Sequence, residues 1–423
     1  AGTLGSSETW SAAGGPWQVT GTLTVPSGVT LTIGAGATVY VDPGASIQVT
    51  GAGRLIAQGT ETNRIRFAAA PGAGNWGALD FLNTTQESRL TYVDIENAGG
   101  TTIGGHNAKC HVNNAVVFFD NMVWGNVPVV QYISFDNSSF VVSNSVFPTY
   151  AGTFNVTSAP EMLHGVTGIP AGGYGVFRGN YFGHTWGFND TIDFTGGNRP
   201  GAILQVIGNV FDGATDDCLD LDSTDAWIEG NVFFGVHQDT QRPNPKDTAS
   251  AISGGQDNAA VSEWTIINNL FYDVDHAVLA KNRNRFVFVN NTVSRVNRAY
   301  GSGVDIAAFN FTDDDVALSP LADGQGAYIA DNVIDDCAVL VANYNAANVT
   351  VRMDGNLFPA GVTWSGPGAG NVSAGAQLAT AGLVPPTTLG AGTVSAGMAV
   401  AARVRAAMVP GPMSPARWTG MFG

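Results

Sequence analysis

Short runs of alternating apolar and polar residues recur along the chain up to about residue 358. They include residues 39–41 (Val-Tyr-Val), 203–207 (Ile-Leu-Gln-Val-Ile) and 264–267 (Trp-Thr-Ile-Ile). Alternation over such short runs is typical of β-strands that turn one face inward, whereas an amphipathic helix repeats its apolar positions every three or four residues. The pattern therefore predicts an all-β chain of many short strands, with almost no helix before residue 359.

A phrase recurs between these runs: a small or polar residue, then asparagine, then two mostly apolar residues. Its asparagines are Asn121, Asn144, Asn180, Asn209, Asn231, Asn269, Asn291, Asn332 and Asn356. Four of the separations are 22 to 24 residues, and the others equal this minimum plus an insertion of roughly 5 to 19 residues. A fixed minimum with insertions is typical of a solenoid that carries its loops on one face. We interpret each asparagine as a turn residue that tolerates left-handed backbone, and stacked turns should align one asparagine above another.

The segment from Leu23 to Phe67 has the same alternation, with denser glycine-rich turns. It contains residues 55–60 (Leu-Ile-Ala-Gln-Gly-Thr) and 63–67 (Asn-Arg-Ile-Arg-Phe). This segment resembles the opening coils of bacterial secreted β-helix proteins of the pectate-lyase-like superfamily. The resemblance covers most of the chain to about residue 358 and implies a right-handed parallel β-helix. It concerns architecture, since one fold can carry many activities.

The composition of the chain changes after Pro359, and the repeat is no longer clear. Residues 360–395 are rich in Gly, Ala, Thr and Pro, and residues 396–408 are compatible with one helix that Pro410 and Pro412 would end. We therefore divide the chain into a β-helix of residues 1–358 and a C-terminal segment of residues 359–423. This segment is predicted to cap the open sheet end, with a disordered linker as the alternative.

The composition limits which partners and which cellular location suit this chain. The net charge is −16 and charged residues make up 12% of the chain, which disfavours binding to a phosphate backbone. The sequence contains no run of ~20 apolar residues, so it predicts no membrane span. Three cysteines cannot all pair with one another, and Cys218 and Cys337 should lie about four coils apart, beyond disulfide reach. The opening Ala1-Gly2-Thr3 is compatible with a mature secreted chain, so we expect an extracellular protein.

Acidic residues concentrate in two consecutive coils, where we expect the chemistry. Aligning residues 190–193 (Asp-Thr-Ile-Asp) with residues 217–220 (Asp-Cys-Leu-Asp) puts Ile192 and Leu219 in the core. The alignment turns Asp193 and Asp220 outward, one above the other. It also stacks Asp190 and Asp217 at the strand edge, and Asp216 and Asp222 join the same patch.

Like charges one strand spacing apart repel, so this patch requires a bound cation, shared protons or a basic partner. Three interpretations remain open. The aspartates cap turns by accepting backbone hydrogen bonds. Alternatively, Asp193, Asp220 and Asp222 hold Ca²⁺ together with backbone carbonyl groups. In the third interpretation, two of the carboxyl groups act as a general acid and base.

The same residues resemble the motifs of polygalacturonase-type glycoside hydrolases. That family carries Asn-Thr-Asp, Asp-Asp-Cys, Gly-His-Gly and Arg-Ile-Lys phrases on successive coils, and this chain has residues 189–193 and 216–218 in the first two positions. The third position, residues 250–255, lacks the histidine, and the fourth, residues 277–281, keeps a lysine but lacks the arginine. The resemblance implies catalytic roles for Asp190, Asp216, Asp217 and Lys281.

Long insertions on a rigid scaffold are common places for binding groups. We select Trp186, His237, Arg242 and Lys246 as candidate substrate-binding residues, because an aromatic ring beside carboxylates suits a sugar chain.

The leading hypothesis is a secreted, carbohydrate-active β-helix that cleaves a polysaccharide. Hydrolysis would use a carboxylate pair from Asp190, Asp193, Asp216, Asp217 and Asp220. β-Elimination would use Ca²⁺ to neutralise a uronate, with Lys246 or Lys281 as the base. The alternative is a non-catalytic extracellular module with a structural, adhesive or filament-forming role, as part of a larger secreted assembly.

Overall fold

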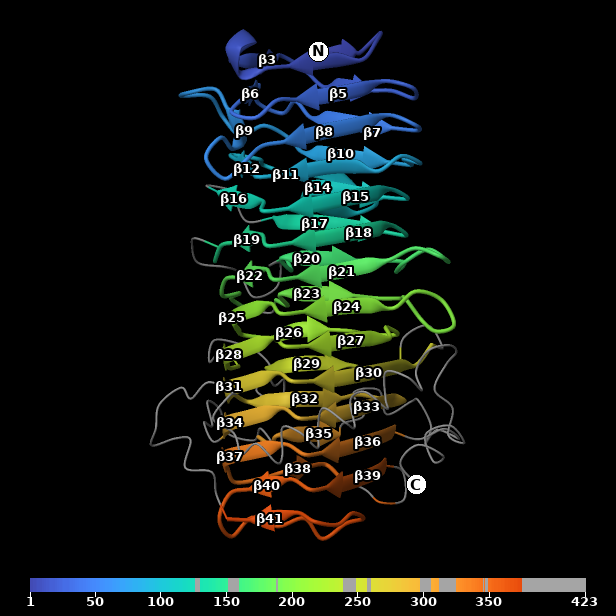
Figure 1. Ribbon diagram of the computed structural model, residues 1–423, viewed down its shortest axis with the longest axis vertical. Helices are drawn as coiled ribbons and strands as arrows, with labels where there is room; N and C mark the ends of the chain where they lie inside the picture. The colour runs from blue at the N-terminus through green and yellow to red at the C-terminus, as the bar shows by residue number, and fades with distance from the viewer. Residues whose placement is uncertain are drawn as a thin grey trace. The chain divides into compact units, whose positions relative to one another are not determined.

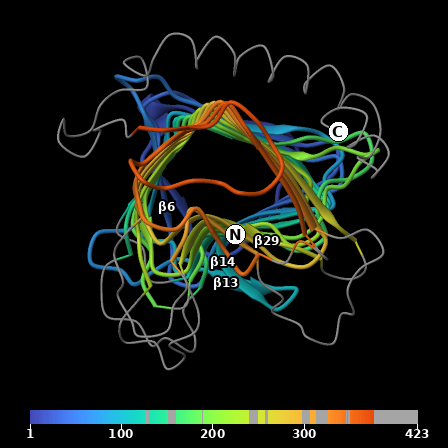
Figure 2. The same cartoon turned by 90° about the horizontal axis from the view of Figure 1, so that it is seen from below.

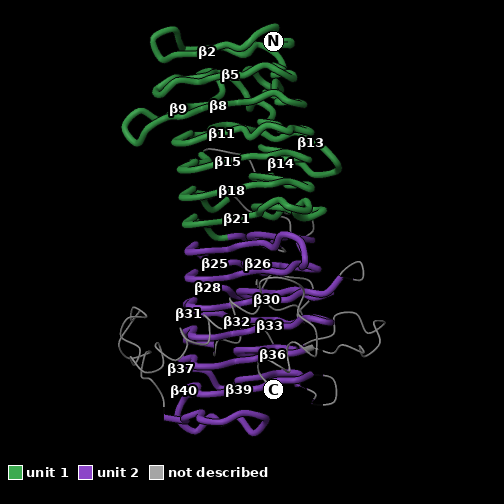
Figure 3. Tube along the Cα trace, turned by 45° about the vertical axis from the view of Figure 1, so that its right-hand side comes forward, with its two compact units in different colours: residues 1–184 green, residues 185–423 purple. Residues whose placement is uncertain are grey.

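The computed structural model describes residues 1–125, 130–150, 160–187, 189–238, 249–256, 260–296, 306–311, 325–344, 346 and 349–374. The chain divides into two compact units, an N-terminal unit of residues 1–184 and a C-terminal unit of residues 185–423 (Figure 3). The candidate residues Arg242 and Lys246 and the predicted helix over residues 396–408 lie outside the described residues.

Each coil of the N-terminal unit contributes one strand to each of three parallel sheets, which we call sheets A, B and C (Figure 1). Sheet A holds β1 (Gly2–Thr3), β4 (Leu23–Val25), β7 (Ile47–Thr50), β10 (Leu79–Leu82), β14 (His106–Asn113), β17 (Gln131–Asp136) and β20 (Leu163–Gly165). Sheet B holds β2 (Glu8–Trp10), β5 (Thr30–Ile33), β8 (Arg54–Gln58), β11 (Ser88–Thr91), β15 (Val116–Asp120), β18 (Ser139–Ser143) and β21 (Gly175–Arg178). Sheet C holds β3 (Trp17–Val19), β6 (Thr38–Val41), β9 (Ile65–Ala69), β12 (Val93–Glu96), β16 (Val123–Gly125), β19 (Val146–Phe147) and β22 (Tyr181–Phe182). A short strand, β13 (Thr101–Ile103), pairs antiparallel with β14.

The C-terminal unit repeats the same three-sheet plan, and its successive coils superpose when they are seen end on (Figure 2). Sheet A holds β23 (Ile192–Phe194), β26 (Asp217–Asp220), β29 (Ser250–Gly254), β32 (His276–Ala280), β35 (Phe309–Phe311) and β38 (Val341–Ala342). Sheet B holds β24 (Leu204–Ile207), β27 (Ala226–Glu229), β30 (Ser262–Ile267), β33 (Asn284–Val289), β36 (Gln325–Ala330) and β39 (Val349–Asp354). Sheet C holds β25 (Val210–Ala214), β28 (Val232–Val236), β31 (Leu270–Val274), β34 (Thr292–Val296), β37 (Val333–Cys337), β40 (Leu357–Phe358) and β41 (Val372–Ser373).

This pairing of each strand with its counterpart in the next coil confirms the predicted right-handed parallel β-helix. Among the described residues the one helical element is the short 3-10 helix η1 (Ala12–Gly14). No helix there is long and apolar enough to cross a membrane. Cys110, Cys218 and Cys337 are buried free thiols, in agreement with the expectation for Cys218 and Cys337.

The interior of each unit is built from the apolar residues that alternate along the strands. Phe211, Phe233 and Phe271 occupy one column of sheet C, and their ring centroids are 4.7 and 5.0 Å apart. Rings at this separation bury large apolar areas and add a stacking contribution. The repeated aromatic residue of the sequence phrase thus forms a continuous column in the core.

The asparagine of the phrase forms a second, polar column. The side-chain oxygen of Asn269 accepts hydrogen bonds from the backbone N–H of Asn231 at 2.8 Å and from its amide group at 3.0 Å. Asn269 in turn donates from the same two groups to Asn291, at 2.8 and 3.0 Å. The ladder runs within the C-terminal unit through Asn209, Asn231, Asn269, Asn291, Asn332, Asn356 and Asn371.

The predicted left-handed backbone of these asparagines is wrong for the ladder members, because the residue before each of them makes the turn. Asn268 has a φ of 59°, and Gly208 and Gly230 have φ of 65° and 69° at the equivalent positions. Asn121 and Asn144, with φ of 54° and 50°, occupy this preceding position and not the ladder. The predicted stacking of the asparagines is confirmed for the ladder. Asn121 and Asn144 were aligned with the ladder asparagines but belong to the turn position one residue before them.

The coils also continue further than predicted. β41 pairs in parallel with β40, and Asn371 accepts hydrogen bonds from Asn356 at 3.0 and 2.9 Å. The stacking therefore passes the predicted boundary at residue 358 and reaches Ser373. Asn371 was hidden from the repeat pattern because its coil is short and glycine-rich.

We predict that Asn269→Ala lowers the free energy of unfolding by about 3 kcal/mol or more, since it leaves several buried donors and acceptors without partners. Asn268→Gly is the matched control, because glycine adopts the left-handed conformation of that position without strain and the Asn268 side chain is half-buried. It should cost less than about 1 kcal/mol. Urea denaturation of the two variants measures both values, and equal losses would contradict the ladder's role.

Candidate functional site

The acidic patch lies on sheet A of the C-terminal unit, where β23, β26 and β29 follow one another (Figure 1). Ile192 pairs with Leu219 and Asp193 with Asp220, which confirms the predicted register of the two coils. Ile192 and Leu219 are fully buried, whereas Asp193 and Asp220 are half-buried on the outer side. The alternation of the sequence therefore sets which of these side chains reach the core and which face outward.

Asp190, Asp216 and Asp217 form the tightest group of carboxylates in this patch. One oxygen from each lies within 4.8 Å of the oxygens of the other two. Asp217 is almost fully buried, whereas Asp190 and Asp216 are half-buried. Three ionised carboxylates at this distance in a partly buried place would repel one another strongly, so the group favours bound protons or a cation.

The pKa values within the patch reflect burial and, after it, this repulsion. Burial raises the pKa of Asp190 and of Asp217 well above the ordinary value of an aspartate, and the charges of Asp216 and Asp220 raise both further. Burial and the charge of Asp220 raise the pKa of Asp222 to about 6, against the opposing effects of Lys281 and of the Gly255 N–H. The site can therefore hold a neutral carboxyl group beside an ionised one near neutral pH.

The same aspartates also make hydrogen bonds between coils. The Oδ1 atom of Asp190 accepts from the backbone N–H of Asp217 at 3.0 Å, and Oδ1 of Asp217 accepts from the N–H of Ser250 at 2.9 Å. Oδ1 of Asp222 accepts from the N–H of Gly255 at 2.8 Å. Capping of backbone groups, one of the three interpretations of the patch, is thus present, and it occupies one oxygen of each of these carboxylates.

Lys281 supplies the basic partner that the patch requires on its other side. Its Nζ atom lies 3.4 Å from both oxygens of Asp220 and 4.0 Å from Oδ1 of Asp222. The structure therefore brings together the five predicted catalytic aspartates and Lys281 in one patch. Asp190, Asp216 and Asp217 form one group, whereas Asp193 pairs with Asp220 in the strand register. Lys281 lies beside Asp220 and the predicted metal ligand Asp222.

The predicted substrate-binding residues are distributed differently. Trp186 is 43% exposed, in a segment that is hydrogen-bonded to the patch: Asn189 donates to its carbonyl oxygen, and Thr215 donates to that of Gly187 at 2.7 Å. The ring nitrogens of His237 face Asp275 at 2.8 Å and Asp273 at 3.4 Å.

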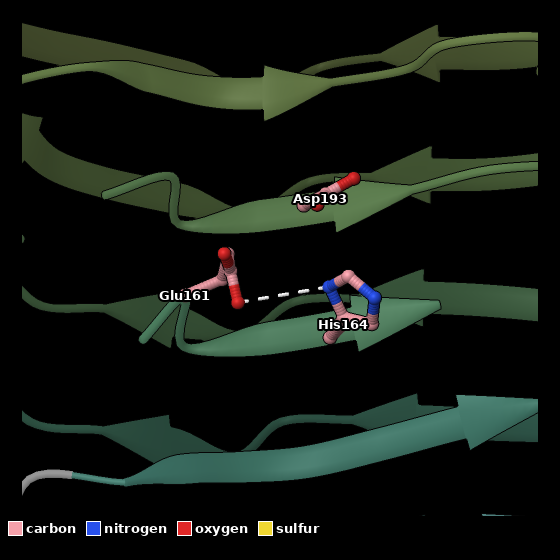
Figure 4. Close-up of side chains that lie close together, drawn as sticks. All are labelled: Glu161, His164 and Asp193. Atoms are coloured by element: carbon pink, nitrogen blue, oxygen red, sulfur yellow. Dashed lines mark ion pairs between the residues drawn. The ribbon is translucent and has the colours of Figure 1, made fainter. Parts of the chain in front are cut away.

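Two other clusters of charged residues carry no sequence motif. In the C-terminal unit, buried Arg199 contacts Asp225 at 3.1 Å and Glu263 at 3.8 Å and ties three successive coils together. In the N-terminal unit, Glu161 forms an ion pair with His164 at 3.6 Å, which contributes to the lowered pKa of Glu161 (Figure 4).

Buried Asp80 and His111 lie 2.9 Å apart in the same unit. A polar residue inside an apolar alternating strand, such as Asp80 in β10, was the available signal. Its partner, His111, lies in the next coil, so the contact could be found only once the pairing register of the two strands was known.

No protein-family model and no curated protein matches the chain. Solved structures do match it at low identity. PfbA, a surface adhesin of Streptococcus pneumoniae, is 10% identical over 79% of this chain and 82% of its own, with a TM-score of 0.37. A rhamnogalacturonan lyase is 17% identical over 76% and 80%, with a TM-score of 0.33. A mutant tailspike protein of E. coli bacteriophage HK620, in complex with a pentasaccharide, is 13% identical over 85% and 73%, with a TM-score of 0.37.

We predict that Asp222→Asn changes the pH dependence of stability. A carboxyl group whose pKa is raised in the folded state favours folding below its unfolded pKa, near 4, and this contribution is lost as the pH rises through the folded value of about 6. The variant should gain about 1–2 kcal/mol over the parent between pH 4 and pH 7, after allowance for solvent screening. Denaturation at both pH values measures this gain.

Asparagine at this position keeps an oxygen that can accept the Gly255 N–H, so the comparison isolates the charge. Asp94→Asn is the control, because Asp94 is a half-buried carboxylate paired with Arg64 at 2.7 Å in the N-terminal unit. A difference between parent and Asp222→Asn that stays constant over this pH range would show that Asp222 is not destabilised by ionisation.

Proposed function

We propose that this chain is a secreted, carbohydrate-active β-helix that hydrolyses a polysaccharide at Asp190, Asp216 and Asp217. The observation that carries the proposal is the approach of these three carboxylates to within 4.8 Å, with burial and mutual repulsion raising the pKa of Asp190 and Asp217. Glycoside hydrolysis needs a carboxyl group that gives a proton to the leaving oxygen and a carboxylate that activates water or attacks the sugar.

Asp190 and Asp217 suit the acid role, because their raised pKa keeps a proton available near neutral pH. Asp216 is the neighbouring carboxylate whose charge raises both of these pKa values. In this proposal Asp216 remains ionised and activates the water, while one of the other two donates the proton. The three then titrate as a coupled set, and the proton moves among them as the reaction proceeds.

Hydrolysis is favoured over elimination by the surroundings of Lys281. Two carboxylates within 4.0 Å stabilise the charged ammonium form of this side chain. A lysine base must lose that proton before it can remove one from the substrate. Lys281 therefore suits an electrostatic role, holding Asp220 and Asp222 beside the reacting group.

We predict that Asp217→Asn and Asp216→Asn each lower kcat by about 10²–10⁴-fold on a polysaccharide that the parent cleaves. The melting temperature of Asp217→Asn should stay within a few degrees of the parent or rise, because the new amide oxygen can still accept from Ser250 and a buried repulsion is removed. Asp94→Asn again serves as the control and should keep full activity.

The substrate comes first from a screen of neutral and uronate-containing glycans, with new reducing ends and unsaturated products scored separately. Unsaturated products would show that the chain cleaves its substrate by elimination and not by hydrolysis. If no glycan in the screen is cleaved and both Asp217→Asn and Asp216→Asn are markedly destabilised, the results favour a structural or adhesive β-helix whose aspartates cap turns.

We further propose that the patch binds Ca²⁺, since its carboxylate oxygens are the hard ligands that this ion prefers. Two ligand sets are available: the predicted Asp193, Asp220 and Asp222, and the tighter group of Asp190, Asp216 and Asp217. Calcium should raise the melting temperature by a few degrees and EDTA should reverse the effect, because a ligand that binds only the folded state stabilises it.

Asn substitutions separate the two sets. Loss of the calcium shift in Asp216→Asn alone assigns the ion to the tighter group, and loss in Asp220→Asn alone assigns it to the other set. Melting curves of the parent that are identical with EDTA and with calcium would leave protons and Lys281 as the groups that balance the charge.

A further inference from the structure

The outer face of sheet C in the C-terminal unit is largely apolar. Its strands β25, β28, β31, β34, β37, β40 and β41 form one stack (Figure 1). The residue after each ladder asparagine points away from the core, and the strand register aligns these residues in one row, which we call the outer column: Val210, Val232, Leu270, Thr292, Val333, Leu357 and Val372. In the opening coils of the chain the same face carries Arg66 and Asp94, and both form ion pairs. A sheet face that meets water is usually polar, so the outer column suits contact with another apolar segment.

Several members of the outer column are buried in spite of their outward direction. Leu270, Thr292 and Val333 are 9%, 4% and 3% exposed. Val146, on the outer face of sheet C in the N-terminal unit, is 37% exposed. Ser294, two residues beyond Thr292 on the same face, is also buried, and its hydroxyl group has no hydrogen-bond partner among the described residues. The stacking of strands alone therefore does not account for this burial, whereas a covering segment would.

We propose that residues 375–423 of this chain, which we call the tail, pack along the outer column and cover it. Val372 is the last member of the outer column and is 53% exposed. The hydroxyl group of Ser373 accepts from the Gly361 N–H at 3.0 Å and donates to the Pro359 carbonyl group at 3.0 Å, which holds the chain at the end of sheet C. The tail therefore begins beside the surface that it covers in this proposal.

Charge favours the tail as the occupant of this surface. All 34 acidic residues of the chain precede residue 375, whereas three of its 18 basic residues lie in the tail: Arg403, Arg405 and Arg417. The net charge is therefore −19 before this point and +3 after it. The outward row next to the outer column includes Asp212 and Asp335. This surface attracts a positively charged tail and repels the acidic part of a second copy of the chain.

The predicted helix over residues 396–408 has dimensions that fit the outer column. In this helix Val400, Val404 and Met408 lie four residues apart and form one apolar stripe, with two of the tail's arginines on its sides. The helix would be ~20 Å long, and five neighbouring members of the outer column span ~19 Å at the strand spacing. The flanking arginines can lay their apolar parts on the sheet and keep their charged ends beside its aspartates.

The longer insertions of this unit that lie outside the described residues suit the outer column less well. Residues 239–248 contain no large apolar side chain, and residues 297–305 contain only Tyr300 and Val304. Residues 312–324 contain four aspartates, whose burial against valine and leucine would be costly. The tail combines apolar side chains with the absence of acidic ones, as the outer column requires.

Photocrosslinking of the full chain tests where the tail lies. Val404 is replaced by p-benzoylphenylalanine, and the matched control carries the same group at Ala402, on the opposite side of the predicted helix. We expect irradiation to join position 404 to peptides of β28, β31, β34 or β37, with a yield about fivefold or more above that of the control, because one side of the helix faces the sheet. A mixture of ¹⁵N-labelled and unlabelled chains shows by mass spectrometry whether the crosslink lies within one chain.

Crosslinks within one chain to these strands support the proposal, and crosslinks to any other part of the chain overturn it. Those to residues 359–371 would place the tail on the open sheet end. Those between labelled and unlabelled chains would place it on a second copy. An equal yield from positions 404 and 402 also overturns the proposal.

A thiol-accessibility measurement checks the same contact without a crosslinker. Leu270→Cys adds one thiol on the outer column, whereas the three native cysteines are buried. In chains that carry this thiol, Val404→Asp should increase the rate of maleimide labelling about tenfold or more, because an aspartate disfavours burial against the apolar row. Ala402→Asp is the control and should leave the rate unchanged. If Val404→Asp loses its strand content by circular dichroism, Val404→Ser takes its place, and a folded variant that labels no faster than the control contradicts the proposal.

Discussion

Within each unit, the paired strand residues lie one strand spacing, ~4.8 Å, from their counterparts in the next coil, and the rest of the structure depends on this constraint. The chain therefore places like groups on like groups, whatever their chemistry. Apolar side chains gain from this arrangement, as the column of Phe211, Phe233 and Phe271 shows. Asparagine also gains, because its side chain carries both a donor and an acceptor, so each member of the ladder satisfies its neighbours on both sides.

Aspartate cannot form such a column without cost. A carboxylate has acceptors alone, and two ionised groups at this distance repel by about 3 kcal/mol at an effective dielectric constant of about 20. The chain reduces the repulsion by turning one oxygen of Asp190 and of Asp217 toward a backbone N–H of the next coil and by bringing Lys281 to Asp220. Burial and the repulsion that remains together raise the pKa of Asp190 and of Asp217. The structural and chemical roles of these residues thus come from the same contacts.

The sequence was sufficient to predict features that repeat over a few residues or match between neighbouring coils. Alternation predicted the strands, and the match of residues 190–193 to residues 217–220 predicted the pairing of Asp193 with Asp220. The asparagine phrase was misaligned by one residue at Asn121 and Asn144, because Asn fits both the left-handed turn position and the ladder position. The contacts of Arg199 with Asp225 and Glu263, and of Lys281 with Asp220, cross insertions of unequal length, so no spacing in the sequence indicates them.

The constraint also explains why the acidic site occupies a short stretch of the solenoid. Along the column that begins with Asp190 and Asp217, the next members are Ser250 and His276, and beside Asp193 and Asp220 the next member is Ser253. A third row of aspartates would add another set of repulsions at ~4.8 Å. Serine at these positions keeps a small polar group next to the carboxylates and ends the accumulation of charge. The acidic column is therefore limited by the same stacking that creates it.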